Sequence, residues 1–143
     1  KVKEKGFSVK LDSNGTNPAM LREVITKGLV DYVAMDMKAP LRNYSKTVAR
    51  PVYTGKIHES IKLLITSDIS YEFRTTLLKA LTTPDDILEI GKEIQGAKAY
   101  YLQKFVPTKL LNPQFRKKVT YSDKELAELQ KKLAPHVSFC GIR

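Results

Sequence analysis

Two carboxylates stand in segments whose other residues are mostly apolar or small: Asp12 in KLDSNG and Asp36 in YVAMDMK. Burying a carboxylate is costly unless it is hydrogen-bonded, paired with a cation or bound to a metal ion. If the two segments form neighbouring strands, Asp12 and Asp36 could share one cation or accept hydrogen bonds from one ligand. Two simpler interpretations stay open: Asp12 caps the turn over residues 14–17, and Asp36 pairs with Lys38.

Two cations accompany these carboxylates. Lys38 follows Asp36 by two residues, so the two side chains share one face of an extended strand. Arg74 stands inside an apolar and β-branched run, YEFRTTLL, where a guanidinium group needs partners. Its planar fork of donors suits a ligand carboxylate or phosphate. A structural ion pair with a nearby Asp or Glu explains Arg74 equally well.

The alternation of strand and helix patterns predicts where these residues lie. Alternating or continuous apolar runs predict strands over residues 7–13, 31–38, 70–78, 98–106 and 137–142. Helical spacing of apolar residues, together with capping residues, predicts helices over residues 18–28, 56–67, 84–94 and 123–136. Four βα units closed by a strand are typical of an α/β fold with a parallel sheet and right-handed crossovers.

Binding sites of such folds lie beyond the carboxyl ends of the strands. Asp12 and Asp36 stand at or near those ends. The sequence contains no P-loop, GxGxxG, HExxH, GxSxG or zinc-ligand spacing. His58 and His136 have no partner at a useful spacing, so we expect surface or capping roles for both.

The net charge of +10 is concentrated in two segments. Residues 37–58 contain five Lys or Arg and residues 94–122 contain six, and neither segment contains Asp or Glu. Each segment contributes a loop at the predicted carboxyl edge of the sheet. We therefore expect a positive surface around the site, suited to an anionic ligand, a nucleic acid or an acidic protein. The alternative is two solvated loops.

Composition limits the class of protein. A chain of 143 residues with 42% hydrophobic content suits one globular domain. No run approaches the roughly 20 apolar residues of a membrane span, and the first ten residues lack the apolar stretch of a secretory signal. The single cysteine, Cys140, excludes an intramolecular disulfide and a cage of cysteine ligands within the chain. We expect a buried thiol in a reduced, cytoplasmic protein.

Three segments carry a family resemblance: Lys10–Thr16 (KLDSNGT), Tyr32–Lys38 (YVAMDMK) and Tyr71–Leu78 (YEFRTTLL). In this order and spacing they resemble the second half of radical S-adenosylmethionine (SAM) activating enzymes. The nearest relatives would be the activating enzymes of anaerobic ribonucleoside-triphosphate reductase and of pyruvate formate-lyase. The later YYLQKFVP segment fits as well, so the resemblance covers nearly the whole chain from about Ser8 onward. It implies part of an incomplete (β/α)6 TIM-like barrel.

The resemblance also implies an activity and partners. Members of this family hold SAM and a [4Fe-4S] cluster at the top of the barrel, and cleave SAM reductively to a 5′-deoxyadenosyl radical. That radical abstracts hydrogen from a glycine of a glycyl radical enzyme, and the electron comes from a donor such as flavodoxin or ferredoxin. On this interpretation we expect neither a membrane nor a nucleic acid as a partner.

The same resemblance implies roles for individual residues. Asp12 and Ser13 would contribute oxygens near the methionyl group of SAM or to a bound monovalent cation, and Asn14 belongs to the same turn. Asp36 would join that ligand set, and Lys38 would lie close by. The resemblance further implies that Arg74 faces the ligand from the next strand.

The sequence departs from the family in several places. It lacks the C-x3-C-x2-C motif that holds the cluster and the G-G-E-P-type segment that grips the methionyl amine. Lys79-Ala80 replaces a usual Pro-Gly, and the region of Val106 replaces a SAM-contacting histidine. Because the chain opens at the family's third strand, we expect residues 1–143 to form a C-terminal half, inactive by itself.

Two alternative functions use the same residues. A non-enzymatic basic α/β module would bind nucleic acid or an acidic partner through its two acid-free segments. A small doubly wound domain would bind a phosphorylated metabolite through Arg74 and Lys38.

Overall fold

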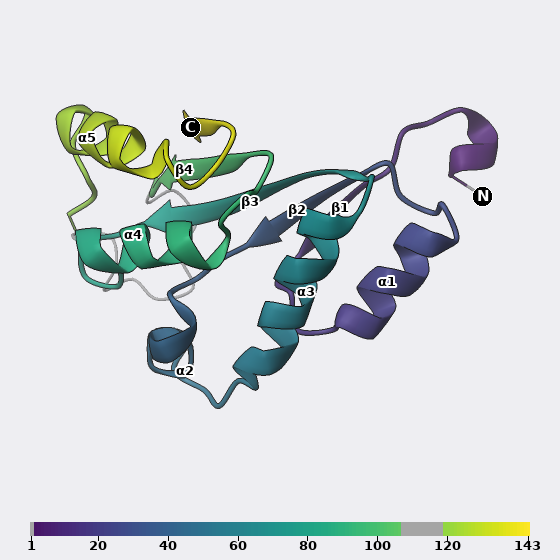
Figure 1. Cartoon of the computed structure of the whole chain (residues 1–143), viewed down its shortest axis with the longest axis horizontal. Helices are drawn as coiled ribbons and strands as arrows, with labels where there is room; N and C mark the ends of the chain where they lie inside the picture. Colours follow the sequence, from purple (N-terminus) through teal and green to yellow (C-terminus); the bar gives the residue numbers. More distant parts are fainter. Residues whose placement is uncertain (1, 107–118) are drawn as a thin grey trace.

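The structure, a computed structural model, describes residues 2–106 and 119–143. Its elements in chain order are η1 (Lys3–Lys5), β1 (Lys10–Ser13), α1 (Pro18–Thr26), β2 (Tyr32–Asp36), η2 (Leu41–Asn43), α2 (Tyr44–Thr47), α3 (Thr54–Thr66), β3 (Ser70–Leu77), α4 (Pro84–Glu93), β4 (Tyr100–Lys104), α5 (Asp123–Leu133) and β5 (Cys140–Ile142). The expected α/β fold of alternating strands and helices is confirmed (Figure 1).

The five strands form one parallel sheet in the order β1-β2-β3-β4-β5. Each strand therefore pairs with its neighbour along the chain, and right-handed crossovers place the connecting helices on one face of the sheet. Figure 1 shows α1, α3 and α4 together on one side of the strands. In the described part of the chain β1 and β5 are edges, so this sheet is not closed into a barrel.

The hydrophobic core lies between the sheet and the helices. Strand residues that point toward the helices are almost fully buried: Val33, Met35, Phe73, Leu77, Tyr100 and Leu102. They pack with Leu21, Ile57, Ile61, Leu64, Ile87, Ile90, Leu126, Leu129 and Leu133 of the helices. The core also buries the hydroxyl of Tyr100, which donates to Thr75 Oγ1 at 2.8 Å. A polar group buried in this way has to be hydrogen-bonded.

The predicted starts of α1, α4 and α5 are confirmed by their caps, whereas α3 begins at Thr54, two residues before the predicted start, without a side-chain cap. Asn17 accepts a hydrogen bond from the backbone N–H of Met20 at 3.1 Å. Thr83 forms a capping box with Asp86, and Ser122 forms another with Glu125. Each cap satisfies N–H groups that the first turn of a helix leaves unpaired.

Gly15 fixes the turn between β1 and α1. Its φ of 72° lies in the left-handed region, and a Cβ there would lie 2.1 Å from Met35 Cε. Its carbonyl accepts a hydrogen bond from Ser60 Oγ at 2.9 Å, so the turn packs against β2 and α3. This turn therefore holds the carboxyl end of β1, where Asp12 lies, against the neighbouring elements.

The structure differs from the expectation in two respects. Strands are shorter than predicted. For example, β4 and β5 pair only over Tyr100–Leu102 and Cys140–Ile142. The segments that lead into these two strands meet only at one isolated bridge, between Ala97 and Val137. The connection after β2 contains η2 and α2 rather than an open loop. Its anchor is Tyr44, a buried side chain whose hydroxyl lies 3.4 Å from the carbonyl of Asp36. Among the described residues no helix is long and apolar enough to cross a membrane.

Candidate ligand-binding face

The sheet face opposite the helices carries charged and polar side chains. Since strand residues alternate between faces, Lys10 and Asp12 of β1, Tyr32 and Asp36 of β2, and Glu72 and Arg74 of β3 share this face. We call it the polar face. Tyr101 of β4 and Arg143, just after β5, complete it on the other side.

Arg74 joins the two carboxylates that the sequence singles out. Asp36 and Arg74 are direct partners in the register of β2 and β3. The Nε of Arg74 donates to Asp36 Oδ1, and its Nη2 lies 2.9 Å from Asp12 Oδ2. Lys38 Nζ reaches the other oxygen of Asp36 at 2.8 Å. The charged residues selected from the sequence, Asp12, Asp36, Lys38 and Arg74, thus form one cluster, which we call the Arg74 cluster.

These contacts set the charge states of the cluster. Burial acts to raise the pKa of Asp36, but hydrogen bonds from Lys38 and Arg74 outweigh it, so the pKa lies below its usual range. Burial acts to lower the pKa of Arg74, but Asp36 and Asp12 hold it above its usual range. The side chain of Arg74 is 16% exposed and that of Asp12 is 61% exposed. Asp36 and Arg74 are therefore ionised, and the cluster is anchored on β3 and open to solvent at Asp12.

A second cluster, which we call the Glu72 cluster, lies beside the first, toward the amino ends of the strands. The carboxylate of Glu72 is 1% exposed and accepts two hydrogen bonds from Arg143, at 2.9 and 3.0 Å. The hydroxyl of Tyr32 donates to it at 3.0 Å and Lys10 Nζ at 3.3 Å. One buried carboxylate thus ties together β1, β2, β3 and the end of β5.

The pKa values of the Glu72 cluster follow from this arrangement. Burial acts to raise the pKa of Glu72, but the donors from Arg143, Tyr32 and Lys10 lower it below its usual range. Burial and the hydrogen bond to Glu72 raise the pKa of Tyr32 to about 12. The cluster therefore holds an ionised Glu72 and a protonated Tyr32 at neutral pH.

Arg143 also stacks on an aromatic ring. Its guanidinium carbon lies 3.3 Å from the centre of the Tyr101 ring, a distance at which a cation is attracted by the ring face. Gly141 makes room for that ring, because a Cβ at this position would lie 2.5 Å from Tyr101 Cε1. The aromatic side chain and the salt bridge to Glu72 together hold Arg143 over the polar face.

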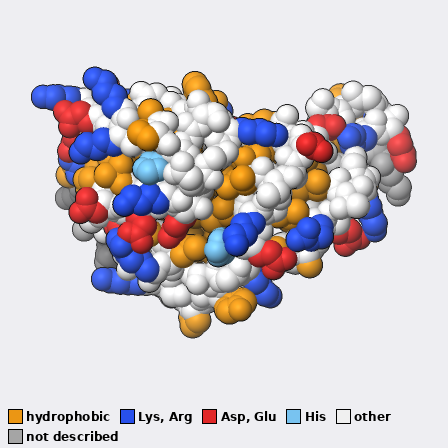
Figure 2. All heavy atoms as spheres, in the orientation of Figure 1, with side chains coloured by type: hydrophobic (Ala, Val, Ile, Leu, Met, Phe, Trp, Pro, Cys, Tyr) orange, Lys and Arg blue, Asp and Glu red, His pale blue; other side chains and the backbone are white. Residues whose placement is uncertain are grey.

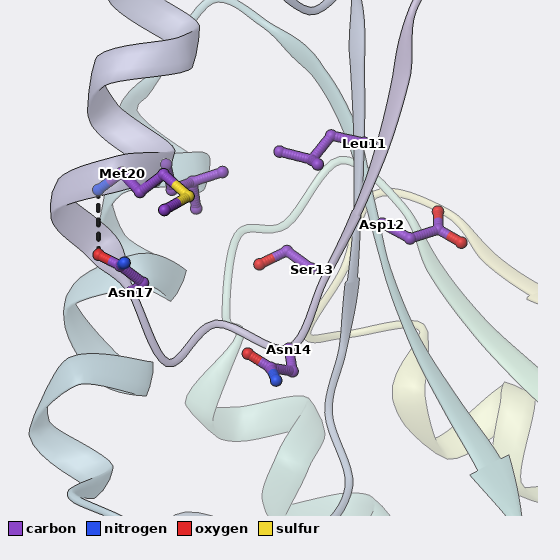
Figure 3. A pocket seen from close by; sticks show the side chains of 7 residues that line it. Leu11, Asp12, Ser13, Asn14, Asn17 and Met20 are labelled. Carbon is purple, nitrogen blue, oxygen red and sulfur yellow. Dashed lines mark hydrogen bonds between the residues drawn. The ribbon is translucent and has the colours of Figure 1, made fainter.

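Ser13 and Asn14 do not join the Arg74 cluster. Figure 3 shows Leu11 and Ser13 pointing to the helix side of β1, whereas Asp12 points the other way. Ser13 Oγ accepts the N–H of Gly15 at 3.0 Å, and Asn14 Oδ1 accepts the N–H of Thr16 at 3.1 Å. Both side chains therefore shape the turn itself. Asp12 pairs with Arg74 instead of capping this turn.

A shallow hollow lies where β1 meets the start of α1 (Figure 3). It is lined by Leu11, Asp12, Ser13, Asn14, Asn17, Met20 and Leu21. The turn residues expected at a ligand site therefore do border a concave surface, and Asp12 is the residue that this hollow shares with the Arg74 cluster.

Four residues of the polar face were not selected from the sequence as candidates: Lys10, Tyr32, Glu72 and Arg143. Glu72 stands two residues before Arg74, and Lys10 stands two residues before Asp12, so each shares a face with a residue that was selected. That period of two is the signal that could have found them. Tyr32 stands four residues before Asp36 and so carries the same signal. Arg143 carries none, because it follows β5 and its contact with Glu72 depends on the register of distant strands.

Cys140 and the two histidines lie apart from the polar face. Cys140 is buried, as expected, and burial raises the pKa of its thiol to about 11. Both histidines lie on the face shown in Figure 2; His58 is exposed on α3, and His136 Nδ1 lies 2.6 Å from Gln95 Oε1. Within residues 2–106 and 119–143 no group of three or more His, Cys, Asp or Glu is arranged to hold a metal ion.

Several cations of the two acid-free segments, residues 37–58 and 94–122, form ion pairs with acidic residues elsewhere in the chain. In the first, Lys38 and Arg42 lie in ion pairs, with Asp36 and with Asp86 and Glu89. In the second, Lys104 pairs with Asp123. Lys109, Arg116, Lys117 and Lys118, which were expected to contribute to the positive surface, lie outside the described residues.

A comparison of sequences identifies a relative. No protein-family model matches the chain. A protein of Methanocaldococcus jannaschii, provisionally named a glycyl-radical enzyme activating enzyme, is 33% identical over 146 aligned positions. The alignment covers 99% of this chain and 61% of that relative, so the chain spans about three fifths of the relative's length.

A solved structure shares the fold. It is the crystal structure of a domain of pyruvate-formate lyase-activating enzyme from Bacteroides vulgatus, with a TM-score of 0.70. The match covers 99% of this chain and 84% of that chain at 12% sequence identity, so it bears on the fold alone. The resemblance expected from the three motifs is confirmed: the chain is related in sequence to a glycyl-radical enzyme activating enzyme and shares its fold with a domain of another activating enzyme.

Proposed function

We propose that the chain is the C-terminal half of a radical SAM activating enzyme that serves a glycyl radical enzyme. On this proposal residues 1–143 form one unit of an incomplete (β/α)6 barrel. The sequential strand order with helices on one face supports it, since barrels of this type are wound in that way. The observation that carries the proposal is the guanidinium of Arg74, held between Asp12 and Asp36 on three consecutive parallel strands.

The donor set of the polar face fits the amino-acid part of SAM. That part carries an ammonium group, a carboxylate and a neighbouring sulfonium charge. Asp12 and Asp36 offer anionic acceptors for the positive groups, while Arg74 and Lys38 offer donors for the carboxylate. In our proposal Ser13 and Asn14 complete the site through the turn that they stabilise. The two aspartates could instead hold a monovalent cation beside the ligand.

The residues of this chain would act by binding and orienting. Arg74 holds the carboxylates of Asp12 and Asp36 at fixed positions, so they are ready to meet a cation without rearrangement. The buried Glu72 fixes the strands beneath this site. When bound and reduced by one electron, SAM supplies the 5′-deoxyadenosyl radical that takes hydrogen from a glycine of the partner enzyme.

The [4Fe-4S] cluster does not fit this chain. Such clusters are held by several cysteine thiolates. The sequence contains one cysteine, and Cys140 is buried on the helix side of the sheet with a raised thiol pKa. We therefore assign the cluster ligands to the remainder of the full-length protein and expect this chain alone to be inactive. A flavodoxin or ferredoxin would supply the electron, in a reducing compartment such as the cytoplasm.

SAM binding by the full-length protein tests the site. Labelled SAM would be measured by anaerobic equilibrium dialysis with wild type, Asp36→Asn, Arg74→Gln and the control Asp68→Asn, an exposed aspartate before β3. We expect about tenfold weaker binding for the first two variants, because each removes a charge-assisted contact, and no change for the control. Equal binding by all four proteins would contradict this placement of the site.

A further inference from the structure

A basic hollow lies between the turn that follows β1 and the connection that leads from β2 into the first turn of α3. It has a volume of about 310 Å³ and is lined by Thr16, Arg50, Pro51, Val52, Tyr53 and Lys56. We call it the basic groove. None of its lining residues belongs to the Arg74 cluster or the Glu72 cluster, so its role is separate from the site proposed above.

The charges of the groove are not neutralised within the described chain. Residues 37–58 carry five cations and no Asp or Glu. Lys38 and Arg42 are held by Asp36, Asp86 and Glu89. Lys46, Arg50 and Lys56 are exposed, and none of them makes an ion pair with any residue in 2–106 or 119–143. Three cations without an ion-pair partner among the described residues thus lie on this one connection, and two of them, Arg50 and Lys56, line the groove.

The wall of the groove is ordered by its own hydrogen bonds. Ser45 Oγ accepts the N–H of Val52 at 3.0 Å, and Arg50 N–H donates to the carbonyl of Ser45 at 3.2 Å. Ala49 is the one non-glycine residue with a positive φ, 53°, among the described residues. A non-glycine residue persists in this conformation only where its surroundings hold it. The cations are therefore presented from a defined backbone.

An exposed aromatic ring adds an apolar contact. Tyr53 is 76% exposed, the highest value among the large hydrophobic residues of the described chain that are exposed. Its ring lies over Gly55, where a Cβ would come within 3.1 Å of the ring carbon Cζ. Tyrosine and arginine are, with tryptophan, the residue types enriched among the residues that contribute most to binding at protein interfaces.

We propose that the basic groove binds an acidic segment of a protein partner. Aspartate or glutamate side chains of that segment would meet Arg50 and Lys56, and an apolar side chain would lie against Tyr53. Nucleic acid fits this surface less well, because a typical complex neutralises about 6–10 phosphates, whereas the described connection offers Lys46, Arg50 and Lys56. If the proposed function holds, the partner is the glycyl radical enzyme; the groove itself does not depend on SAM.

A binding measurement without SAM tests the groove. The probe is a fluorescein-labelled peptide of about ten residues, rich in Glu and Asp with one central Leu, followed by anisotropy at about 50 and 200 mM salt. We expect binding that weakens with salt, and about fivefold or more loss of affinity in the double variant Arg50→Gln and Lys56→Gln. Tyr53→Ala should weaken binding without changing the salt dependence.

Matched controls decide between the outcomes. The double variant Lys124→Gln and Lys131→Gln removes the same charge from exposed positions of α5 and should bind like wild type. The proposal is overturned by absent binding, by equal loss in the control pair, or by tighter binding of a single-stranded DNA that depends on Arg50 and Lys56. Because no SAM is present, failure here leaves the proposed SAM site untouched.

Discussion

Arg74 and Asp36 face each other directly across β2 and β3, and the same guanidinium reaches Asp12 on β1 at 2.9 Å. One side chain on the central strand therefore positions two carboxylates that stand 24 residues apart in the sequence. Substituting Arg74 or Asp36 therefore changes the charge of the polar face and weakens the ion pairs that connect β1, β2 and β3.

Asp36→Asn should lower the stability of the fold. It removes the anion shared by Arg74 and Lys38, whose hydrogen bonds are charge-assisted. We expect a loss of about 1–2 kcal/mol in the free energy of unfolding, because the site is partly exposed and water replaces some of the contact. Urea denaturation at pH 7 measures this loss. Asp68→Asn, at an exposed position, should leave the stability within about 0.5 kcal/mol of wild type; an equal effect would contradict the account.

Glu72→Gln should be more damaging. The carboxylate is 1% exposed and accepts hydrogen bonds from Arg143, Tyr32 and Lys10. The side-chain amide of glutamine would remove the negative charge and place an NH₂ donor where one carboxylate oxygen now accepts. We expect a loss of about 2–3 kcal/mol, less than for a fully buried pair because Arg143 and Lys10 are themselves partly exposed. Chemical denaturation is the measurement, and Glu128→Gln on the surface of α5 is the matched control. A neutral result at Glu72 would show that the cluster does not hold the strands.

Acid should destabilise the protein through the same carboxylates. The pKa values of Asp36 and Glu72 are lowered in the fold, and that of Glu125 is lowered to about 2 by Lys79 and Ser122. Carboxyl groups of the unfolded chain titrate near 4, so below that pH the unfolded state binds more protons than the folded state. Stability should therefore be full above about pH 5 and fall as the pH drops from about 4 toward 2. Unfolding curves across this range that showed no loss would refute the prediction.

Glu93→Gln should raise the stability of the fold at neutral pH, in contrast to the substitutions of Asp36 and Glu72. Burial raises the pKa of Glu93; its Oε1 accepts the N–H of Leu41 at 2.8 Å, while its Oε2 is buried without a partner among the described residues. The charged form is therefore disfavoured in the fold at neutral pH. We expect the variant to gain about 0.5–1 kcal/mol at pH 7, and the gain to fall away as the pH drops below about 4, where the wild-type carboxyl becomes protonated in the unfolded state as well. A loss of stability at pH 7 would contradict this reading.

The order of strands and helices, and the approach of Asp12 to Asp36, could be predicted from the sequence. Periodicity and caps such as Asn17 and Thr83 indicated the βα order, and the rule that sites lie at strand carboxyl ends brought Asp12 and Asp36 together. The finer arrangement could not be predicted in the same way. Glu72 meets Arg143 across 71 residues, and that contact depends on the register of the whole sheet. Ser13 directly follows Asp12 on β1 and therefore points to the opposite face, where its oxygen accepts the N–H of Gly15; the alternation of strand side chains could have indicated this.

The production of 5′-deoxyadenosine tests the central proposal most directly. The full-length protein would be reconstituted anaerobically with iron and sulfide, reduced with dithionite and supplied with SAM. The account predicts cluster absorbance and 5′-deoxyadenosine from the wild type, with about tenfold less product from Asp36→Asn at limiting SAM. A wild-type protein that forms no cluster, or that forms one and yields no 5′-deoxyadenosine, would contradict it.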